Sequence, residues 1–201
     1  MSEFLSAIWI PHKQKMICAD FRQHFTSWQE TLRQDYAYEQ GHEFTWPQDD
    51  NGKSIRLRAL GEDGRQLETG SAEYETMRCL ILRHWPTRGA LLAYLLRQRV
   101  DADGVVEGDL EMSFLAEITP DIAEVFQRIT RVTGNFDLGG LATLDAGALP
   151  KLAQTGDFYL DRLATLDAGA LPKLAQTGDF YLDRLATLDA GALPKLAQTG
   201  D

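Results

Sequence analysis

The stretch LATLDAGALPKLAQTGDFYLDR, residues 141–162, decides the fold of this chain because it is repeated. The same 22 letters return at 163–184, and the first seventeen of them return at 185–201. A fixed period of 20–30 residues is typical of a solenoid, in which each repeat forms one coil and stacks on the next. We therefore expect a stack of 22-residue coils in this part of the chain.

The period begins before the identical copies. Each unit carries a glycine followed by a short alternating run: VEGDLEMS (106–113), VTGNFDLG (132–139), and QTGDFYLD at 154–161 and 176–183. The glycines are Gly108, Gly134, Gly156, Gly178 and Gly200, at intervals of 26, 22, 22 and 22 residues. The repeat region therefore starts near residue 105, and its first coil is four residues longer than the others.

One unit is predicted to form a strand and a return arm. Phe158 and Leu160 alternate with Tyr159 and Asp161, a pattern that predicts a short, half-buried strand. In the return arm Gly169 permits a bend, and a short helical turn or irregular segment follows. In the longer first coil, TPDIAEVFQRI (119–129) predicts a helix capped by Thr119. A helical-hairpin repeat is the alternative, but 22 residues are few for two helices and two loops.

The spacing Leu-x-x-Leu, followed by glycine and a Leu-x-Leu-like strand, resembles the leucine-rich-repeat superfamily. The run ITRVTGNFDL (129–138) is similar to the L-x-x-I-x-G-x-L-x-I run of the receptor L-domain-like members, here in a bacterial type without disulfide caps. The resemblance covers residues 105–201 and leaves the N-terminal half unassigned. It implies a curved stack of parallel strands whose exposed face binds other macromolecules.

Residues 1–104 predict a small α+β domain, or a cap on the solenoid. A helix is expected over 17–33 and a hairpin from EFTW (43–46) and SIRLRAL (54–60). Ser71 caps a helix that ends before Pro86, and Thr87 caps a second helix. The fold class is thus α/β: an α+β domain or cap over 1–104, then a leucine-rich-like parallel solenoid over 105–201 with coils of 22–26 residues.

Composition narrows the class of protein. No apolar run approaches the ~20 residues that a membrane-spanning helix needs. The first residues, MSEFLSAIWIPHKQ, lack the basic segment and long apolar core of a signal peptide. Two cysteines are too few for a disulfide scaffold. We therefore expect a cytoplasmic protein with no membrane partner.

The net charge of −10 is confined to the second half of the chain. Residues 1–100 contain 13 Lys/Arg and 13 Asp/Glu, whereas residues 101–201 contain 7 Lys/Arg and 17 Asp/Glu. Contacts with phosphate need lysine and arginine. The acidic half therefore argues against direct nucleic-acid binding and suits a protein partner with a basic surface.

No arrangement of residues indicates catalysis. His12, Cys18 and His24 recur every six residues, a spacing that turns successive side chains of a helix about 120° apart. Metal ligands on one helix favour spacings of three or four residues. Phosphate-binding, dinucleotide-binding, serine-elbow and zinc-protease motifs are absent. We expect no enzyme activity, no catalytic residue, no metal and no cofactor.

The predicted strands place acidic and aromatic side chains on their outer face. The candidate partner-binding residues are Glu111, Asp137, Tyr159, Asp161, Tyr181 and Asp183. One interpretation is a recognition face for a basic protein surface. The other is an ordinary solvated face, on which tyrosine occupies strand positions by propensity. Calcium binding is disfavoured because the glycine-rich nonapeptide of calcium-bound β-rolls is absent.

Three functions follow as hypotheses: a non-enzymatic protein-binding repeat protein; an acidic inhibitor or nucleic-acid mimic that occupies a basic groove; and an enzyme in residues 1–104 with a repeat targeting arm.

The copy at 185–201 stops just after the glycine of a new strand. That ending has three explanations: a longer native protein, self-association through the C-terminal edge of the solenoid, or disorder of the last partial copy.

Overall fold

The computed structural model describes residues 5–10, 15–18, 41–46, 56–60, 68 and 70–197. Before residue 68 it describes the backbone of four strands. The chain divides into two compact units, Met1–Leu91 and Leu92–Asp201.

The first unit contains an antiparallel sheet with the strand order β2-β1-β3-β4. Its strands are β1 (Leu5–Ile10), β2 (Lys15–Cys18), β3 (Gly41–Trp46) and β4 (Arg56–Leu60). The hairpin predicted from EFTW and SIRLRAL is confirmed, because β3 pairs with β4 and Phe44 lies opposite Leu57. Alternating apolar and polar residues in both segments favour this pleated pairing.

The helix expected over residues 17–33 is wrong at its start. Ile17 and Cys18 belong to β2, where Ile17 lies opposite Ile8 and Cys18 lies opposite Ala7. The β-branched Ile17 suits a pleated strand, and pairing with β1 satisfies backbone groups along this segment. The aromatic and leucine positions that predicted the helix, from Phe21 to Leu32, lie outside the described residues.

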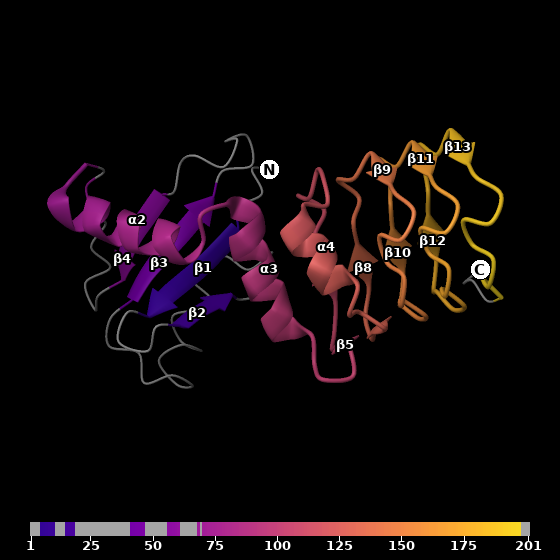
Figure 1. Cartoon of the computed structure of the whole chain (residues 1–201), viewed down its shortest axis with the longest axis horizontal. Coiled ribbons are helices and arrows are strands. Elements are labelled where there is room, and N and C mark those ends of the chain that lie inside the picture. The colour runs from indigo at the N-terminus through magenta and orange to yellow at the C-terminus, as the bar shows by residue number, and fades with distance from the viewer. Residues whose placement is uncertain are drawn as a thin grey trace. The chain divides into compact units, whose positions relative to one another are not determined.

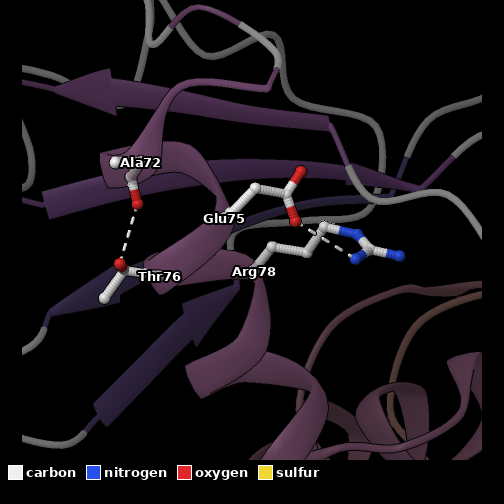
Figure 2. Close-up of polar contacts among 4 residues, drawn as sticks. All are labelled: Ala72, Glu75, Thr76 and Arg78. Atoms are coloured by element: carbon white, nitrogen blue, oxygen red, sulfur yellow. Dashed lines mark hydrogen bonds and ion pairs between the residues drawn. The ribbon is translucent and has the colours of Figure 1, made fainter.

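Two helices follow the sheet as predicted. Helix α2 (Ala72–His84) begins at Ser71, whose hydroxyl accepts a hydrogen bond from the Tyr74 N–H at 3.1 Å. Within α2 the Thr76 hydroxyl donates to the Ala72 carbonyl oxygen at 2.7 Å, and Arg78 pairs with Glu75 at 3.4 Å (Figure 2). The helix ends at Trp85, since Pro86 disfavours helical geometry in the residue before it.

Helix α3 (Arg88–Arg99) starts in the first unit and ends in the second. The Thr87 hydroxyl accepts a hydrogen bond from the Ala90 N–H at 3.0 Å, which confirms the predicted cap. Near the end of the helix, Arg99 donates to the carbonyl oxygens of Glu107 and Asp109, and Arg97 pairs with Glu124 at 2.9 Å. The end of α3 is therefore tied to the first coil of the repeat region.

Residues 105–188 form a parallel β-solenoid of about four coils, as the period predicted. Three ladders of parallel strands run along it. The first contains β6 (Leu110–Glu111), β8 (Phe136–Asp137), β10 (Phe158–Tyr159) and β12 (Phe180–Tyr181). The second contains β9 (Thr143–Leu144), β11 (Thr165–Leu166) and β13 (Thr187–Leu188). In Figure 1 β8, β10 and β12 follow one another as one row, and β9, β11 and β13 as another.

The third ladder pairs β5 (Val105–Val106) with β7 (Arg131–Val132) and continues as single bridges from Arg131 to Gln154 and on to Gln176. The helical-hairpin alternative is therefore wrong. The return arm also holds more strand than expected, since both later ladders lie in it. Its leucines alternate with outward residues instead of following a helical spacing: Leu144 and Leu166 are buried, while Thr143 and Thr165 point outward.

The core consists of columns of equivalent residues. Phe136 stacks on Phe158 with ring centroids 5.2 Å apart, and Phe158 stacks on Phe180 at 5.5 Å. Leu138 and Leu160 form the neighbouring buried column. One coil cannot cover its own apolar face, so each coil buries apolar side chains of the next. Each large side chain buried in this way stabilises the fold by roughly 1.5–3 kcal/mol.

The return arm of the first coil, which is four residues longer than the others, contains helix α4 (Pro120–Phe126). Ile122, Val125 and Phe126 are buried, as the predicted apolar face requires. Phe126 meets Phe136 edge to face, with ring centroids 6.1 Å apart. The helix therefore joins the column of phenylalanines. Thr119 lies at its N-cap position but makes no side-chain cap hydrogen bond.

Three of the glycines before the first-ladder strands, Gly134, Gly156 and Gly178, lie where coils approach closely. A Cβ on Gly156 would lie 2.6 Å from the Gly134 carbonyl oxygen, closer than real Cβ contacts. The Gly156 N–H donates to that same oxygen at 2.8 Å. The glycine of the return arm has a different role, because Gly169 has a φ of +77°, which permits the predicted bend.

Candidate partner-binding face

The first ladder brings four of the six predicted residues into one outward row. Glu111 pairs in register with Asp137, Asp137 with Tyr159, and Tyr159 with Tyr181. Their neighbours along each strand, Leu110, Phe136, Phe158 and Phe180, point into the solenoid. Because side chains alternate across a strand, the row faces outward, and its four members are half-buried.

Asp161 and Asp183 lie two residues beyond the tyrosines, on the same side of the chain. Asp161 is half-buried and Asp183 is exposed. The equivalent residue of the preceding coil is Gly139, whose N–H donates to Asp137 Oδ1 at 2.8 Å. A Cβ on Gly139 would lie 3.1 Å from Asp137 Oδ1 and 3.4 Å from Asp161 Oδ2. The carboxylates of Asp137 and Asp161 thus converge beside a residue that has no side chain. We call the six residues the acidic–tyrosine face.

Tyr159 and Tyr181 form a stacked pair, with ring centroids 4.5 Å apart and planes 2° from parallel. Each hydroxyl is held by a carboxylate of its own strand entrance. Tyr159 donates to Asp157 Oδ2 at 3.2 Å, and Tyr181 donates to Asp179 Oδ2 at 3.0 Å. Because β10 and β12 pair in register, the two rings stack along the solenoid axis. Stacking and hydrogen bonding fix both rings before any partner arrives.

Asp157 and Asp179 belong to a second column that supports the face. Asp109 Oδ1 accepts from the Asn135 N–H at 2.8 Å, Asn135 Oδ1 from the Asp157 N–H at 3.1 Å, and Asp157 Oδ1 from the Asp179 N–H at 3.0 Å. We call these four residues the Asx column. Within it, Asp157 and Asp179 also hold the tyrosine hydroxyls, a role that the sequence did not predict. The signal was their invariant place two residues before each outward residue.

The electrostatics reflect crowding of like charges. Burial raises the pKa of the Asp161 carboxyl, and the carboxylates of Asp183 and Asp137 raise it further. The hydrogen bond to Asp179, followed by burial, raises the pKa of the Tyr181 phenol to about 12. Burial and the hydrogen bond to Asp157 likewise raise the pKa of Tyr159. The fold therefore holds a neutral pair of phenols within a negatively charged field.

Within the described part of the chain, no group of three or more His, Cys, Asp or Glu side chains is placed to hold a metal ion. No helix among the described residues is long and apolar enough to cross a membrane. Of the sequence-spaced trio, Cys18 lies in β2, while His12 and His24 lie outside the described residues.

Comparison with known proteins returned no match: no family model, no curated protein and no solved structure resembles the chain closely enough to count.

Proposed function

We propose that this chain is a non-enzymatic protein-binding protein, and that the acidic–tyrosine face docks onto a basic surface of its partner. The observation that carries the proposal is the stacked tyrosine pair, Tyr159 on Tyr181, in which each hydroxyl donates a hydrogen bond to an aspartate. Aromatic side chains that are already ordered lose little conformational entropy on binding, which favours affinity.

Charge complementarity supports the same partner. Asp137, Asp161 and Asp183 lie near one another on this face, and their mutual repulsion lowers the stability of the free protein. A cationic partner surface would relieve that repulsion and accelerate encounter. A nucleic-acid-handling enzyme with a basic groove is one class of such a partner.

Three further features belong to the proposal. The leucine-rich-like character of the coils rests on the leucine spacing and on ITRVTGNFDL. A capping role for the N-terminal part rests on its place in the chain directly before the first coil. A cytoplasmic location rests on the two cysteines and on the composition of the first residues.

The test is affinity capture with the full chain from an extract of its source cells. The face variant combines Tyr159→Ala with Tyr181→Ala, and a second variant combines Asp161→Asn with Asp183→Asn. The matched control is Asp145→Asn with Asp167→Asn, which makes the same charge change in the return arms. We expect a basic protein to be captured by the wild type and the control but lost by both face variants.

Salt provides the second criterion. A complex held by this face should dissociate as the salt approaches about 1 M, where the Debye length is near 3 Å. Capture of the same proteins by all variants, or a complex indifferent to salt, would contradict the proposal. Circular dichroism of each variant checks that the strand signal of the solenoid is retained.

A further inference from the structure

Tyr159 and Tyr181 are two phenols that the fold holds against one another. They pair in register because β10 and β12 are neighbouring parallel strands. Their ring centroids are 4.5 Å apart, and their planes are 2° from parallel. Both side chains are half-buried, so part of each remains in contact with solvent. The pair is therefore both close enough to react with itself and accessible to a reagent in solution.

Each phenol also has its own proton acceptor. The Tyr159 hydroxyl donates to Asp157 Oδ2 at 3.2 Å, and the Tyr181 hydroxyl donates to Asp179 Oδ2 at 3.0 Å. A carboxylate within hydrogen-bond distance can take a proton directly from the group that reacts. The hydrogen bond to Asp179 raises the pKa of Tyr181 to about 12, so this phenol is neutral at neutral pH. It must therefore release its proton when it loses an electron, and the aspartate accepts that proton.

We propose that Tyr159 and Tyr181 form a modification site, at which a one-electron oxidant links the two side chains as dityrosine. The oxidant belongs to the class that peroxidases form from hydrogen peroxide. It removes one electron from each phenol, and the two phenolic protons pass to Asp157 and Asp179.

The two neutral phenoxyl radicals then couple, and a bond forms between one ring carbon of each that lies next to the oxygen-bearing carbon. Each of these two carbons loses its hydrogen as a proton, and each phenolic oxygen regains a proton. In total the oxidant gains two electrons and two protons are released. The linked product is thus two hydrogen atoms lighter than the original pair.

Coupling requires the rings to turn, because the new bond lies in the plane of each ring whereas the stacked rings meet face to face. Rotation about the Cβ–Cγ bond, a soft torsion in tyrosine, turns the edges of the rings toward one another. The phenolic oxygen lies on the axis of this rotation, so it keeps its place beside the aspartate. The pairing of β10 with β12 holds the two residues level throughout. The reaction therefore needs no change of strand pairing.

This inference goes beyond the proposed function, because no partner protein takes part in the reaction. The link would join two coils through residues that are 22 positions apart in the sequence. A covalent bond that closes a loop restricts the unfolded chain, as a disulfide does. Oxidation should therefore make these two coils harder to unfold.

The test treats the full chain with a peroxidase and hydrogen peroxide, at a protein concentration low enough that the yield per chain does not change on dilution. Dityrosine is followed by its blue fluorescence. Monomers are then separated from linked oligomers by size-exclusion chromatography in denaturant, and their intact mass is measured. Trypsin cleaves after lysine and arginine, so it releases both tyrosines in the same peptide, LAQTGDFYLDR, from 152–162 and from 174–184.

We expect oxidised monomers that are two hydrogen atoms lighter than the untreated chain and that yield two linked copies of this peptide. Tyr159→Phe and Tyr181→Phe should each abolish the link, because phenylalanine keeps the ring but cannot form a phenoxyl radical. Tyr94→Phe removes a tyrosine of helix α3 instead and is the matched control. It should retain the link.

A double variant, Asp157→Asn with Asp179→Asn, tests the proton acceptors. Asparagine still accepts hydrogen bonds through its oxygen, but it cannot take the phenolic proton, so the link should form several-fold more slowly at neutral pH. Asp145→Asn with Asp167→Asn makes the same charge change in the return arms and should leave the rate unchanged. Links formed only between chains, a link that persists in either phenylalanine variant, or equal rates with and without Asp157 and Asp179 would overturn the inference.

Discussion

Asp157 holds two neighbours at once: its Oδ1 atom accepts a hydrogen bond from the backbone N–H of Asp179, 3.0 Å away in the next coil. Its Oδ2 atom accepts from the hydroxyl of Tyr159 at 3.2 Å. One carboxylate therefore fixes both the spacing of two coils and the orientation of a ring on the acidic–tyrosine face. The same carboxylate therefore contributes to stability and, under the proposed function, to recognition.

Asp157→Ala should lower the free energy of unfolding by about 1–3 kcal/mol, because it leaves the Asp179 N–H without its acceptor. Asp157→Asn should be much milder, since Asn135 already performs the same role toward Asp157. Urea denaturation measures both variants, with the exposed Asp145→Ala as the control. Equal losses for the alanine and asparagine variants would contradict the role assigned to the Asx column.

Gly156→Ala should destabilise the solenoid by roughly 1–3 kcal/mol, because its Cβ overlaps the backbone of Gly134 in the preceding coil. Gly169→Asn is the matched substitution in a return arm. Gly169 has a positive φ but nothing within 4 Å of a Cβ, and asparagine tolerates that backbone conformation. Thermal unfolding should rank Gly156→Ala far below Gly169→Asn, and the reverse order would exclude close coil approach as the reason for Gly156.

Leu166 and Leu188 occupy the same position in consecutive coils but differ in burial. Leu166 is fully buried, whereas Leu188 is 57% exposed. Leu166→Ala should therefore cost about 2–5 kcal/mol, and Leu188→Ala about 0.5 kcal/mol. Chemical denaturation of the two variants at low protein concentration makes the comparison. A large loss for Leu188→Ala would reveal that another surface covers this leucine in solution.

Alkaline pH should weaken the fold through the tyrosine pair. The pKa of Tyr181 is raised to about 12 from its ordinary value of 10, so the neutral phenol is favoured in the folded state. That contribution is complete below pH 10 and is lost as the pH rises toward 12. The denaturation midpoint should fall across this window. Asp179→Asn should move the ionisation of Tyr181, followed by ultraviolet absorbance, to lower pH.

Asp161→Asn should stabilise the protein at neutral pH while it weakens partner capture. Burial raises the pKa of Asp161, so its contribution to stability is complete below its ordinary pKa of 3.8 and is lost as the pH rises through the raised value. At neutral pH the ionised carboxylate is therefore unfavourable in the fold. The increase in the free energy of unfolding caused by Asp161→Asn should shrink as the pH falls toward about 4. Asp145→Asn, which makes the same charge change in a return arm, is the control for net charge.

The sequence predicted the columns of the solenoid because the period shows which residues are equivalent. It placed Phe136 and Phe158 inside and Tyr159 outside, as the structure has them. It missed the second ladder, since LATLD has leucine spacing compatible with a turn as well as a strand, and it missed the third, which consists of two-residue strands and single bridges. The pairing of Thr143 with Thr165 supplies the strand geometry, and it joins residues 22 positions apart.

The role of the Asx column was missed for a related physical reason. The residue types at 109, 135, 157 and 179 predict polar strand entrances, but their partners are backbone N–H groups of another coil. No local pattern reveals a bond of that kind. At the face itself, the positions of Glu111, Asp137, Tyr159 and Tyr181 followed from alternation alone, whereas the stacking and the pinned hydroxyls needed coordinates.

Because identical coils pair in register, the size of the acidic–tyrosine face depends on the number of 22-residue copies that the gene encodes. Each 22-residue copy finds the same neighbours wherever it is inserted, so unequal recombination within the repeated DNA would add or remove whole coils without disturbing the ladders. Every added coil would bring one more tyrosine and one more pair of flanking aspartates, while Asp137 would stay at the end of the stack. Selection could therefore adjust the avidity of the proposed binding in discrete steps through the number of copies, while the chemistry of each coil stays the same.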